Sequence, residues 1–109
     1  KIALATSNSV PLLEACLKNN GIYDYFDSIT TTDEVSNVKN CPDVYLLAAK
    51  KLNVNPKNCI VFEDILPAIK GAKAADMTVI AVSDKHSLND LDEIINHSDK
   101  YINSYFELI

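Results

Sequence analysis

Short apolar runs alternate with helical patterns of apolar residues along the whole chain. The runs predict strands at Ile2 to Ala5, Ser28 to Thr31, Cys59 to Phe62 and Thr78 to Val82. The first run is continuous rather than alternating in polarity, which is typical of a strand that is covered on both faces. Strands that alternate with helices predict right-handed crossovers and a parallel sheet with helices on both faces.

Apolar residues at helical spacing predict helices in the segments between these strands. Ser9 can cap the first helix and Gly21 is its expected end. We expect the second helix to start from Asp43 as its N-cap and the fourth to start in the stretch SLND, residues 87–90. The expected inward-facing residues of the helices are Leu13, Cys16 and Leu17; Val44, Leu47, Ala48 and Leu52; Ile65, Ile69 and Ala72; and Leu88, Leu91 and Ile95. The tail, Lys100 to Ile109, is expected to hold a short edge strand and a final helical turn.

Length and composition restrict the class of protein. The chain has 109 residues, of which 48% are hydrophobic, enough for a single α/β domain with a core. A formal net charge of −5 argues against nucleic acid or an anionic membrane as a partner. Cysteine is present three times without a CxxC pair and no apolar run reaches membrane-spanning length, so we expect a cytoplasmic protein. The apolar run that directly follows Lys1 suggests a fragment of a longer protein.

Polar residues follow the predicted strands where a parallel α/β sheet binds its ligands, outside the carboxyl ends of the strands. The candidates are Thr6, Ser7 and Asn8 after the first strand, Lys39 in the loop beyond the second, Glu63 and Asp64 after the third, and Ser83 and Asp84 after the fourth. Because all the strands are expected to end on one side, these residues are expected to share one rim.

The chemistry of this rim suits a phosphate and a divalent cation. Two adjacent carboxylates repel each other, but a bound Mg²⁺ offsets this repulsion, and Mg²⁺ takes few protein ligands together with phosphate and water. The hydroxyl of Thr6 before a helix N-terminus is suited to an anion. A lysine about 4 Å from a phosphate contributes roughly 4 kcal/mol before desolvation. These groups are the usual components of phosphoryl transfer, although the chain has no candidate nucleophile early in its sequence.

Three motifs carry a resemblance to a known family. LATSNS, VKNCPDVYLLAAKKL and CIVFEDILPAIKGAKAADMTVIAV occur in this order. Together they resemble the haloacid dehalogenase-like hydrolases, in the branch of β-phosphoglucomutase and small phosphosugar phosphatases. The resemblance covers residues 1 to about 84 and is vague beyond Ser87. It implies a Rossmann-like three-layer core domain over residues 1–109 that lacks the family's first strand, with its DxD motif, and its helical cap.

The resemblance also implies residue roles. Thr6 corresponds to the phosphate-binding hydroxyl, with Ser7 and Asn8 adding contacts. Lys39 corresponds to the lysine that steadies the phosphoaspartate. Asp64 corresponds to a magnesium ligand and Glu63 to a second ligand, direct or through water. The implied activity is Mg²⁺-dependent phosphoryl transfer on a small phosphorylated substrate, by a phosphatase or a phosphomutase. Without the nucleophile, the isolated chain is expected to be inactive.

The chain departs from the family pattern at three positions. Asn40 stands where the family usually has proline after the lysine. Ile65 and Ala68 stand where it usually has a small polar residue and a glycine after the acidic pair. The last two changes touch the loop that shapes the metal site, so they bear on metal affinity more than on the fold.

Other readings of these residues remain open. Thr6 could end a strand, Lys39 could be a solvated loop charge, and the acidic pair could begin a helix. A non-catalytic binding domain on the same scaffold is an alternative that Ile65 and Ala68 favour. A signalling receiver domain is a further alternative, but receivers place the acidic pair before the threonine and lysine. Neither the identity of the substrate nor an oligomeric state follows from the sequence.

Overall fold

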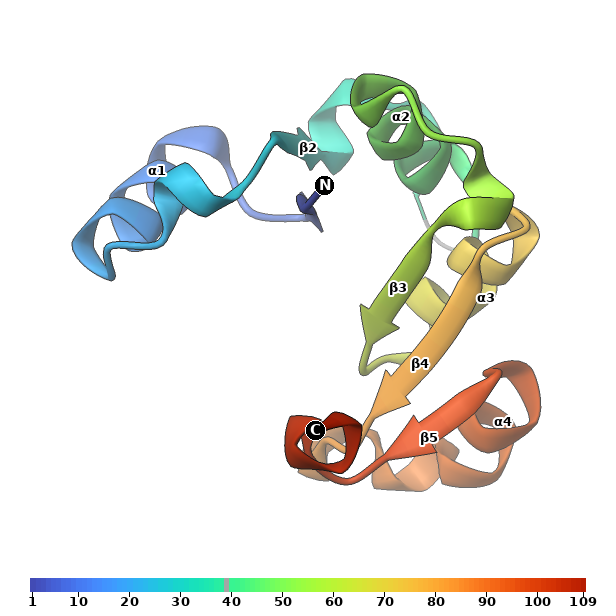
Figure 1. Ribbon diagram of the computed structural model, residues 1–109. Helices are drawn as coiled ribbons and strands as arrows, with labels where there is room; N and C mark the ends of the chain where they lie inside the picture. Colours follow the sequence, from blue (N-terminus) through green and yellow to red (C-terminus); the bar gives the residue numbers. More distant parts are fainter. Residues whose placement is uncertain (39) are drawn as a thin grey trace.

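The computed structural model describes residues 1–38 and 40–109, which form two parallel sheets (Figure 1). The first sheet pairs β1 (Ala3–Thr6) with β2 (Ser28–Thr31). The second has the order β3 (Ile60–Glu63), β4 (Thr78–Val82), β5 (Lys100–Ile102). The α/β class and the parallel strand direction confirm the predicted Rossmann-like fold, but one continuous sheet was expected and two are present.

Helix α1 (Val10–Asn19) lies between β1 and β2 in the chain and buries Leu13 and Leu17. Cys16 was expected on the same face, but its side chain is exposed. The helix ends before Gly21, whose φ of +68° lies in the left-handed region that glycine adopts without strain. Ser9 is the N-cap by position, although its side chain makes no capping hydrogen bond.

Helix α2 (Asp43–Leu52) packs against β1, β2 and α3 (Leu66–Ala74). Its N-cap is Pro42, one residue before the predicted cap, and its buried residues are Val44, Tyr45, Ala48 and Ala49. Gly71 of α3 lies so close to the start of α2 that a Cβ atom would lie 2.6 Å from the backbone oxygen of Cys41, which precedes α2, and 3.2 Å from the ring of Tyr45. A side chain at position 71 would therefore push the helices apart.

The segment after β4 differs from the prediction of one helix. A 3-10 helix (Lys85–Asp90) precedes helix α4 (Leu91–His97), and a final 3-10 helix (Tyr105–Leu108) follows β5. Leu88 and Ile95 were expected to face inward, but they are 58% and 47% exposed, whereas Ile94 is 2% exposed. The shorter helix changes which of two adjacent isoleucines meets the core.

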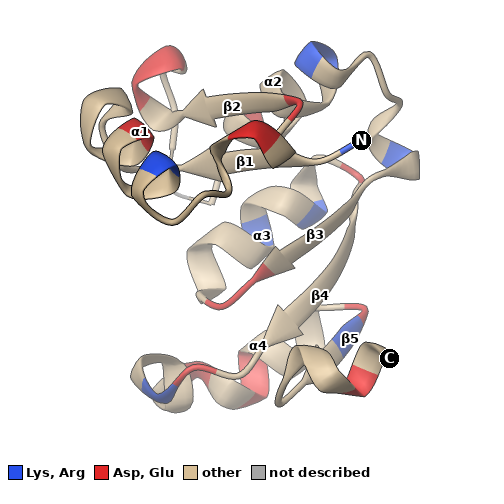
Figure 2. Cartoon of the chain, turned by 60° about the vertical axis from the view of Figure 1, so that its left-hand side comes forward, with Lys and Arg blue, Asp and Glu red and all other residues tan. Residues whose placement is uncertain are grey.

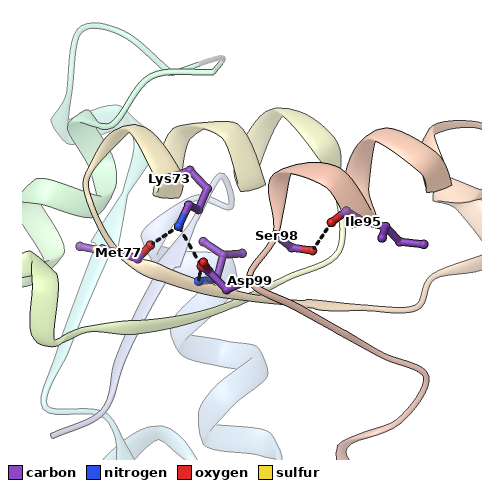
Figure 3. Close-up of polar contacts among 6 residues, drawn as sticks. Lys73, Met77, Ile95, Ser98 and Asp99 are labelled. Carbon is purple, nitrogen blue, oxygen red and sulfur yellow. Dashed lines mark hydrogen bonds and ion pairs between the residues drawn. The ribbon is translucent and has the colours of Figure 1, made fainter.

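The core lies between the second sheet and helices α2, α3 and α4. The residues that lose essentially all solvent contact here are Ile69, Ala72, Val79 and Ala81. At one border of the core, the Asp99 carboxylate accepts a hydrogen bond from Lys73 Nζ (2.8 Å), as Figure 3 shows. It also accepts one from the backbone N–H of Val79 (2.7 Å). This contact ties the end of α3 to the start of β5.

The strands β2, β3 and β4 point to the same side of the molecule, and acidic residues colour the carboxyl end of β3 (Figure 2). The parallel direction therefore places the polar residues that follow β1 and β3 on one side, as the sequence predicted. No helix among residues 1–38 and 40–109 is long and apolar enough to cross a membrane.

Candidate functional site

A cavity of about 410 Å³ lies at the carboxyl ends of β1 and β3. Thr6 and Ser7 line it from the end of β1, and Glu63 and Asp64 line it from the end of β3. These residues are separated by more than fifty positions in the sequence, and the parallel strands bring them to one space. The structure therefore brings together a hydroxyl pair and a carboxylate pair around a common cavity.

Thr6 is the last residue of β1 and pairs with Thr31 of β2. Its Oγ1 atom accepts a hydrogen bond from the backbone N–H of Asn8 at 3.2 Å, which fixes the turn that leads into α1. Asn8 itself does not line the cavity, so its contribution within the described residues is to this turn. The hydroxyl of Thr6 can still donate a hydrogen bond to a bound anion.

Glu63 is held from two directions. Tyr45 Oη donates a hydrogen bond of 2.8 Å to Glu63 Oε1, and the backbone N–H of Asp64 donates one of 3.3 Å to Oε2. Burial raises the pKa of Glu63, and these two hydrogen bonds oppose that rise by stabilising the ionised form. The same burial, together with the charge of Glu63, raises the pKa of the Tyr45 hydroxyl, which therefore stays protonated and acts as a donor.

Asp64 lies between two cavities. It lines the first one and also a second of about 520 Å³, which Ser83 and Asp84 share. Burial raises the pKa of Asp64, and the neighbouring Asp84 carboxyl raises it further. The backbone N–H of His86 donates to Asp84 Oδ1 at 2.9 Å, which lowers the pKa of Asp84. Of the acidic pair, Asp64 is the carboxylate less engaged by protein donors.

Tyr45 is the site residue that sequence reasoning missed. The predicted inner face of its helix contains only aliphatic residues and alanine, and it leaves out Tyr45. Its position one residue after Val44 and three before Ala48, both buried, was the available signal. A buried tyrosine needs a partner for its hydroxyl, so its place on that face could have indicated a nearby acceptor.

The predicted cation of the site, Lys39, lies outside the described residues. Within residues 1–38 and 40–109, no cluster of three histidine, cysteine or acidic side chains is arranged to hold a metal ion. Two adjacent carboxylates still fit Mg²⁺, because this ion keeps several waters and takes one or two protein carboxylates beside a phosphate. Asp64 and Glu63 supply such a donor set, and Asp64 has the freer oxygens.

The two residues that depart from the expected metal-site loop also line the first cavity. Ile65 and Ala68 do so together with Pro67, and the Ile65 side chain is 46% exposed. Ile65 was expected to face the core of its helix, but it is instead the N-cap residue of α3. The wall of the cavity beside Asp64 is therefore apolar.

The family model, the related sequences and the solved structures all indicate the same family. The family model described as haloacid dehalogenase-like hydrolase matches residues 1–76. The fructose-1-phosphate phosphatase YqaB of Escherichia coli (strain K12) is 37% identical over 81 residues, which are 74% of this chain and 43% of YqaB.

Solved structures of related proteins match nearly the whole length of this chain. The structure of CbbY from Rhodobacter sphaeroides in complex with phosphate has a TM-score of 0.88 and 31% identity, and covers 99% of this chain and 48% of its own. The β-phosphoglucomutase of Clostridium difficile has a TM-score of 0.78 and 30% identity, covering 96% of this chain and 44% of its own. The chain thus spans less than half the length of these relatives.

Proposed function

Because the chain belongs to the haloacid dehalogenase-like hydrolase family, we propose that it forms most of the catalytic core of a phosphoryl-transfer enzyme. The proposed substrates are small phosphorylated metabolites, and the enzyme is a phosphatase or a phosphomutase. The observation that carries this proposal is the common cavity lined by Thr6, Ser7, Glu63 and Asp64. The names of the fructose-1-phosphate phosphatase and the β-phosphoglucomutase support a phosphorylated sugar as the substrate class.

We assign the phosphate to the Thr6 side of the cavity. The Thr6 hydroxyl and Ser7 are the proposed donors, and the turn that follows them leads into the positive end of α1. Asn8 shapes that turn through its backbone bond to Thr6. Lys39 is the proposed countercharge that steadies the phosphorylated intermediate.

The carboxylates form the opposite side. Asp64 is the proposed Mg²⁺ ligand, and Glu63 is a second ligand, direct or through water. The hydrogen bonds from Tyr45 and from the Asp64 backbone favour the water-mediated contact for Glu63, because both of its oxygens already accept protein donors. A bound Mg²⁺ would supply charge neutralisation for the transferring phosphoryl group.

The covalent step needs a group that we place outside residues 1–109. We propose an aspartate as the nucleophile, whose carboxylate oxygen forms a bond to phosphorus while the phosphate ester bond to the substrate breaks. The substrate oxygen leaves as a hydroxyl, with its proton supplied by a second aspartate that the family resemblance implies as the general acid and base. Water then releases the phosphate in a phosphatase, and a second substrate hydroxyl accepts it in a mutase. The isolated chain is accordingly expected to bind phosphate and Mg²⁺ weakly and to hydrolyse nothing.

The test uses the full-length protein with Mg²⁺ and a panel of phosphate monoesters. We expect Asp64→Asn and Thr6→Val to lower kcat/KM by about a hundredfold or more, since each removes a group that contacts transition-state charge. Asp24→Asn, a change of the same chemical kind at an exposed residue outside both cavities, is the matched control and should retain activity. A full-length protein that is inert across the panel would contradict the proposal.

A non-catalytic binding domain is the second candidate, and the apolar wall of Ile65 and Ala68 beside Asp64 favours it. Thermal unfolding of the full-length protein during an Mg²⁺ titration distinguishes the two. A rise in Tm that Asp64→Asn removes supports the enzyme, because a ligand that binds the native state stabilises it by mass action. An unchanged Tm at millimolar Mg²⁺ supports the binding domain.

A further inference from the structure

The hydroxyl of Tyr45 is held in a fixed place beside the proposed metal ligands. Tyr45 lies near the start of α2 and is buried. Its ring lies against α3 at Gly71, where the absence of a side chain leaves room for it: a Cβ atom there would be 3.2 Å from Tyr45 Cε2. A ring packed in this way keeps one orientation, because the interior leaves no space for another rotamer. The hydroxyl at the tip of the ring is therefore fixed as well.

This hydroxyl and one backbone group together engage both oxygens of Glu63. Tyr45 Oη donates to Oε1 at 2.8 Å, and the N–H of Asp64 donates to Oε2 at 3.3 Å. A tyrosine hydroxyl ionises only near about pH 10, so at neutral pH it remains a donor. A cation that bound both oxygens of Glu63 at once would compete with both donors. A metal-bound water, by contrast, can donate to a lone pair that is still free.

The neighbouring carboxylate is open by comparison. Asp64 lines both the cavity of about 410 Å³ and the cavity of about 520 Å³. The acidic pair thus combines one open carboxylate with one whose two oxygens are already engaged. Asp64 can bind a cation directly without the loss of the two hydrogen bonds to Glu63. Direct binding through both oxygens of Glu63 requires those hydrogen bonds to break or weaken.

Divalent cations differ in how well they fit such a pair. Mg²⁺ requires near-ideal octahedral geometry, keeps several waters and is usually bound by one or two carboxylates. Ca²⁺ takes about six to eight oxygen ligands and often binds a carboxylate through both oxygens. One open carboxylate beside an engaged one therefore suits Mg²⁺, but it leaves Ca²⁺ with few protein oxygens.

We propose that Tyr45 is a positioning residue that makes this site select Mg²⁺ over Ca²⁺. Its hydroxyl keeps Oε1 of Glu63 engaged and so prevents the glutamate from binding a cation through both oxygens. Without the hydroxyl, Oε1 is free, and Ca²⁺ gains an oxygen ligand that Mg²⁺ does not need. The proposal rests on the proposed metal site of Asp64 and Glu63, but on no step of the phosphoryl transfer.

Isothermal titration calorimetry of the full-length protein measures this selectivity directly, with magnesium chloride and calcium chloride as separate ligands and no substrate present. We expect the native protein to bind Mg²⁺ at least about tenfold more tightly than Ca²⁺, and Asp64→Asn to abolish the binding of both ions. Tyr45→Phe should strengthen Ca²⁺ binding by about tenfold and change Mg²⁺ binding by less than about threefold. The native measurement tests the proposal even where Tyr45→Phe does not fold.

Two further variants separate the hydrogen bond from other effects of the substitution. Tyr25→Phe removes the same hydroxyl from a residue that is exposed and lies outside both cavities, so it should leave both affinities unchanged. Tyr45→Phe combined with Glu63→Gln should lose the gain in Ca²⁺ affinity, because a neutral amide has only one oxygen to offer. Circular dichroism without metal establishes that each variant is folded.

A native protein that binds Ca²⁺ as tightly as Mg²⁺, or a folded Tyr45→Phe variant with an unchanged ratio of the two affinities, would overturn the proposal. If Mg²⁺ binding still depends on Asp64 in that case, the proposed function stands without it. Binding of neither ion at millimolar concentration would refute the metal site and this proposal together. A shifted ratio in a protein that hydrolyses no phosphate monoester would support this proposal while the proposed function failed.

Discussion

Replacing Tyr45 with phenylalanine removes a single hydroxyl from the packing between α2 and β3. That hydroxyl donates to Glu63 Oε1 at 2.8 Å, in partly buried surroundings. Hydrogen bonds to charged groups contribute about 1.5–3 kcal/mol to stability. We therefore expect Tyr45→Phe to lower the free energy of unfolding by about 2 kcal/mol at pH 7, and to raise the pKa of Glu63 further, because the lost bond opposes the effect of burial.

Urea denaturation measures this change directly. With an m value of about 1–3 kcal/mol per molar urea, the midpoint should fall by roughly 1 M. Tyr25→Phe is the matched control: its side chain is 69% exposed, so the same loss of a hydroxyl should change stability by less than about 0.5 kcal/mol. The aromatic ring is kept in both variants, so only the hydroxyl is lost.

A double-mutant cycle tests whether Glu63 is the reason. In the Glu63→Gln background the acceptor is neutral, and a neutral hydrogen bond contributes only about 1 kcal/mol. The cost of Tyr45→Phe should therefore shrink by about 1 kcal/mol, which is the coupling energy of the pair. An equal cost in both backgrounds would refute the reasoning, since the hydroxyl would then act through packing or another partner.

Three further predictions concern the scaffold around the site. Gly71→Ala should lower the free energy of unfolding, measured by urea denaturation, by about 1–3 kcal/mol. Its Cβ would lie 2.6 Å from a backbone oxygen, and this clash exceeds the ~1 kcal/mol gain in helix propensity. A gain in stability would show that α2 and α3 separate easily. Ile94→Ala should cost about 2–4 kcal/mol and its neighbour Ile95→Ala less than about 0.5 kcal/mol, since they are 2% and 47% exposed; equal losses would contradict the assigned face of α4. Asp99→Asn should lower the free energy of unfolding by about 1 kcal/mol at pH 7, because the ion pair with Lys73 is partly exposed and solvent therefore screens it. The hydrogen bond from Lys73 is the main cause that lowers the pKa of Asp99, and the N–H of Val79 is the next. The stabilisation is therefore present above the unfolded pKa of about 3.9 and is lost as the pH falls through the lower folded value. A difference in stability between the variant and the native chain that persists at pH 2 would contradict this.

Local patterns of apolar and polar residues were sufficient to predict the order of strands and helices along the chain. The strands at Ser28–Thr31 and Thr78–Val82 lie where the apolar runs predicted them, and the strand at Ile60–Glu63 is displaced by one residue. These runs are short and are bounded by turn residues and helical patterns, so each is defined by its own neighbours. The order of the polar residues that follow the strands was fixed in the same way.

Patterns inside the helices were less informative. The face of α4 was assigned to Leu88 and Ile95 because the helix was expected to begin at residue 87, yet it begins at Leu91 and turns Ile94 inward. A change in the start of a helix changes which residues lie on the inner face, and a 3-10 segment cannot be distinguished from the first turn of an α-helix by apolar spacing alone. Tyr45 was missed for a related reason, because burial depends on what packs opposite.

The sequence by itself determined that strands and helices alternate, that the strands run parallel, and that hydroxyl and carboxylate residues follow the ends of β1 and β3. Pairing is parallel within each sheet, and the residues at the ends of β1 and β3 line one cavity. Only the tertiary structure decided that the two acidic residues differ, because Glu63 accepts hydrogen bonds from Tyr45 and from the backbone of Asp64, whereas the Asp64 carboxylate is less engaged by protein donors. It alone also decided that the sheet is split between β1 and β3, because backbone pairing between strands depends on which segments are neighbours in space, and no local pattern of side chains encodes a neighbour.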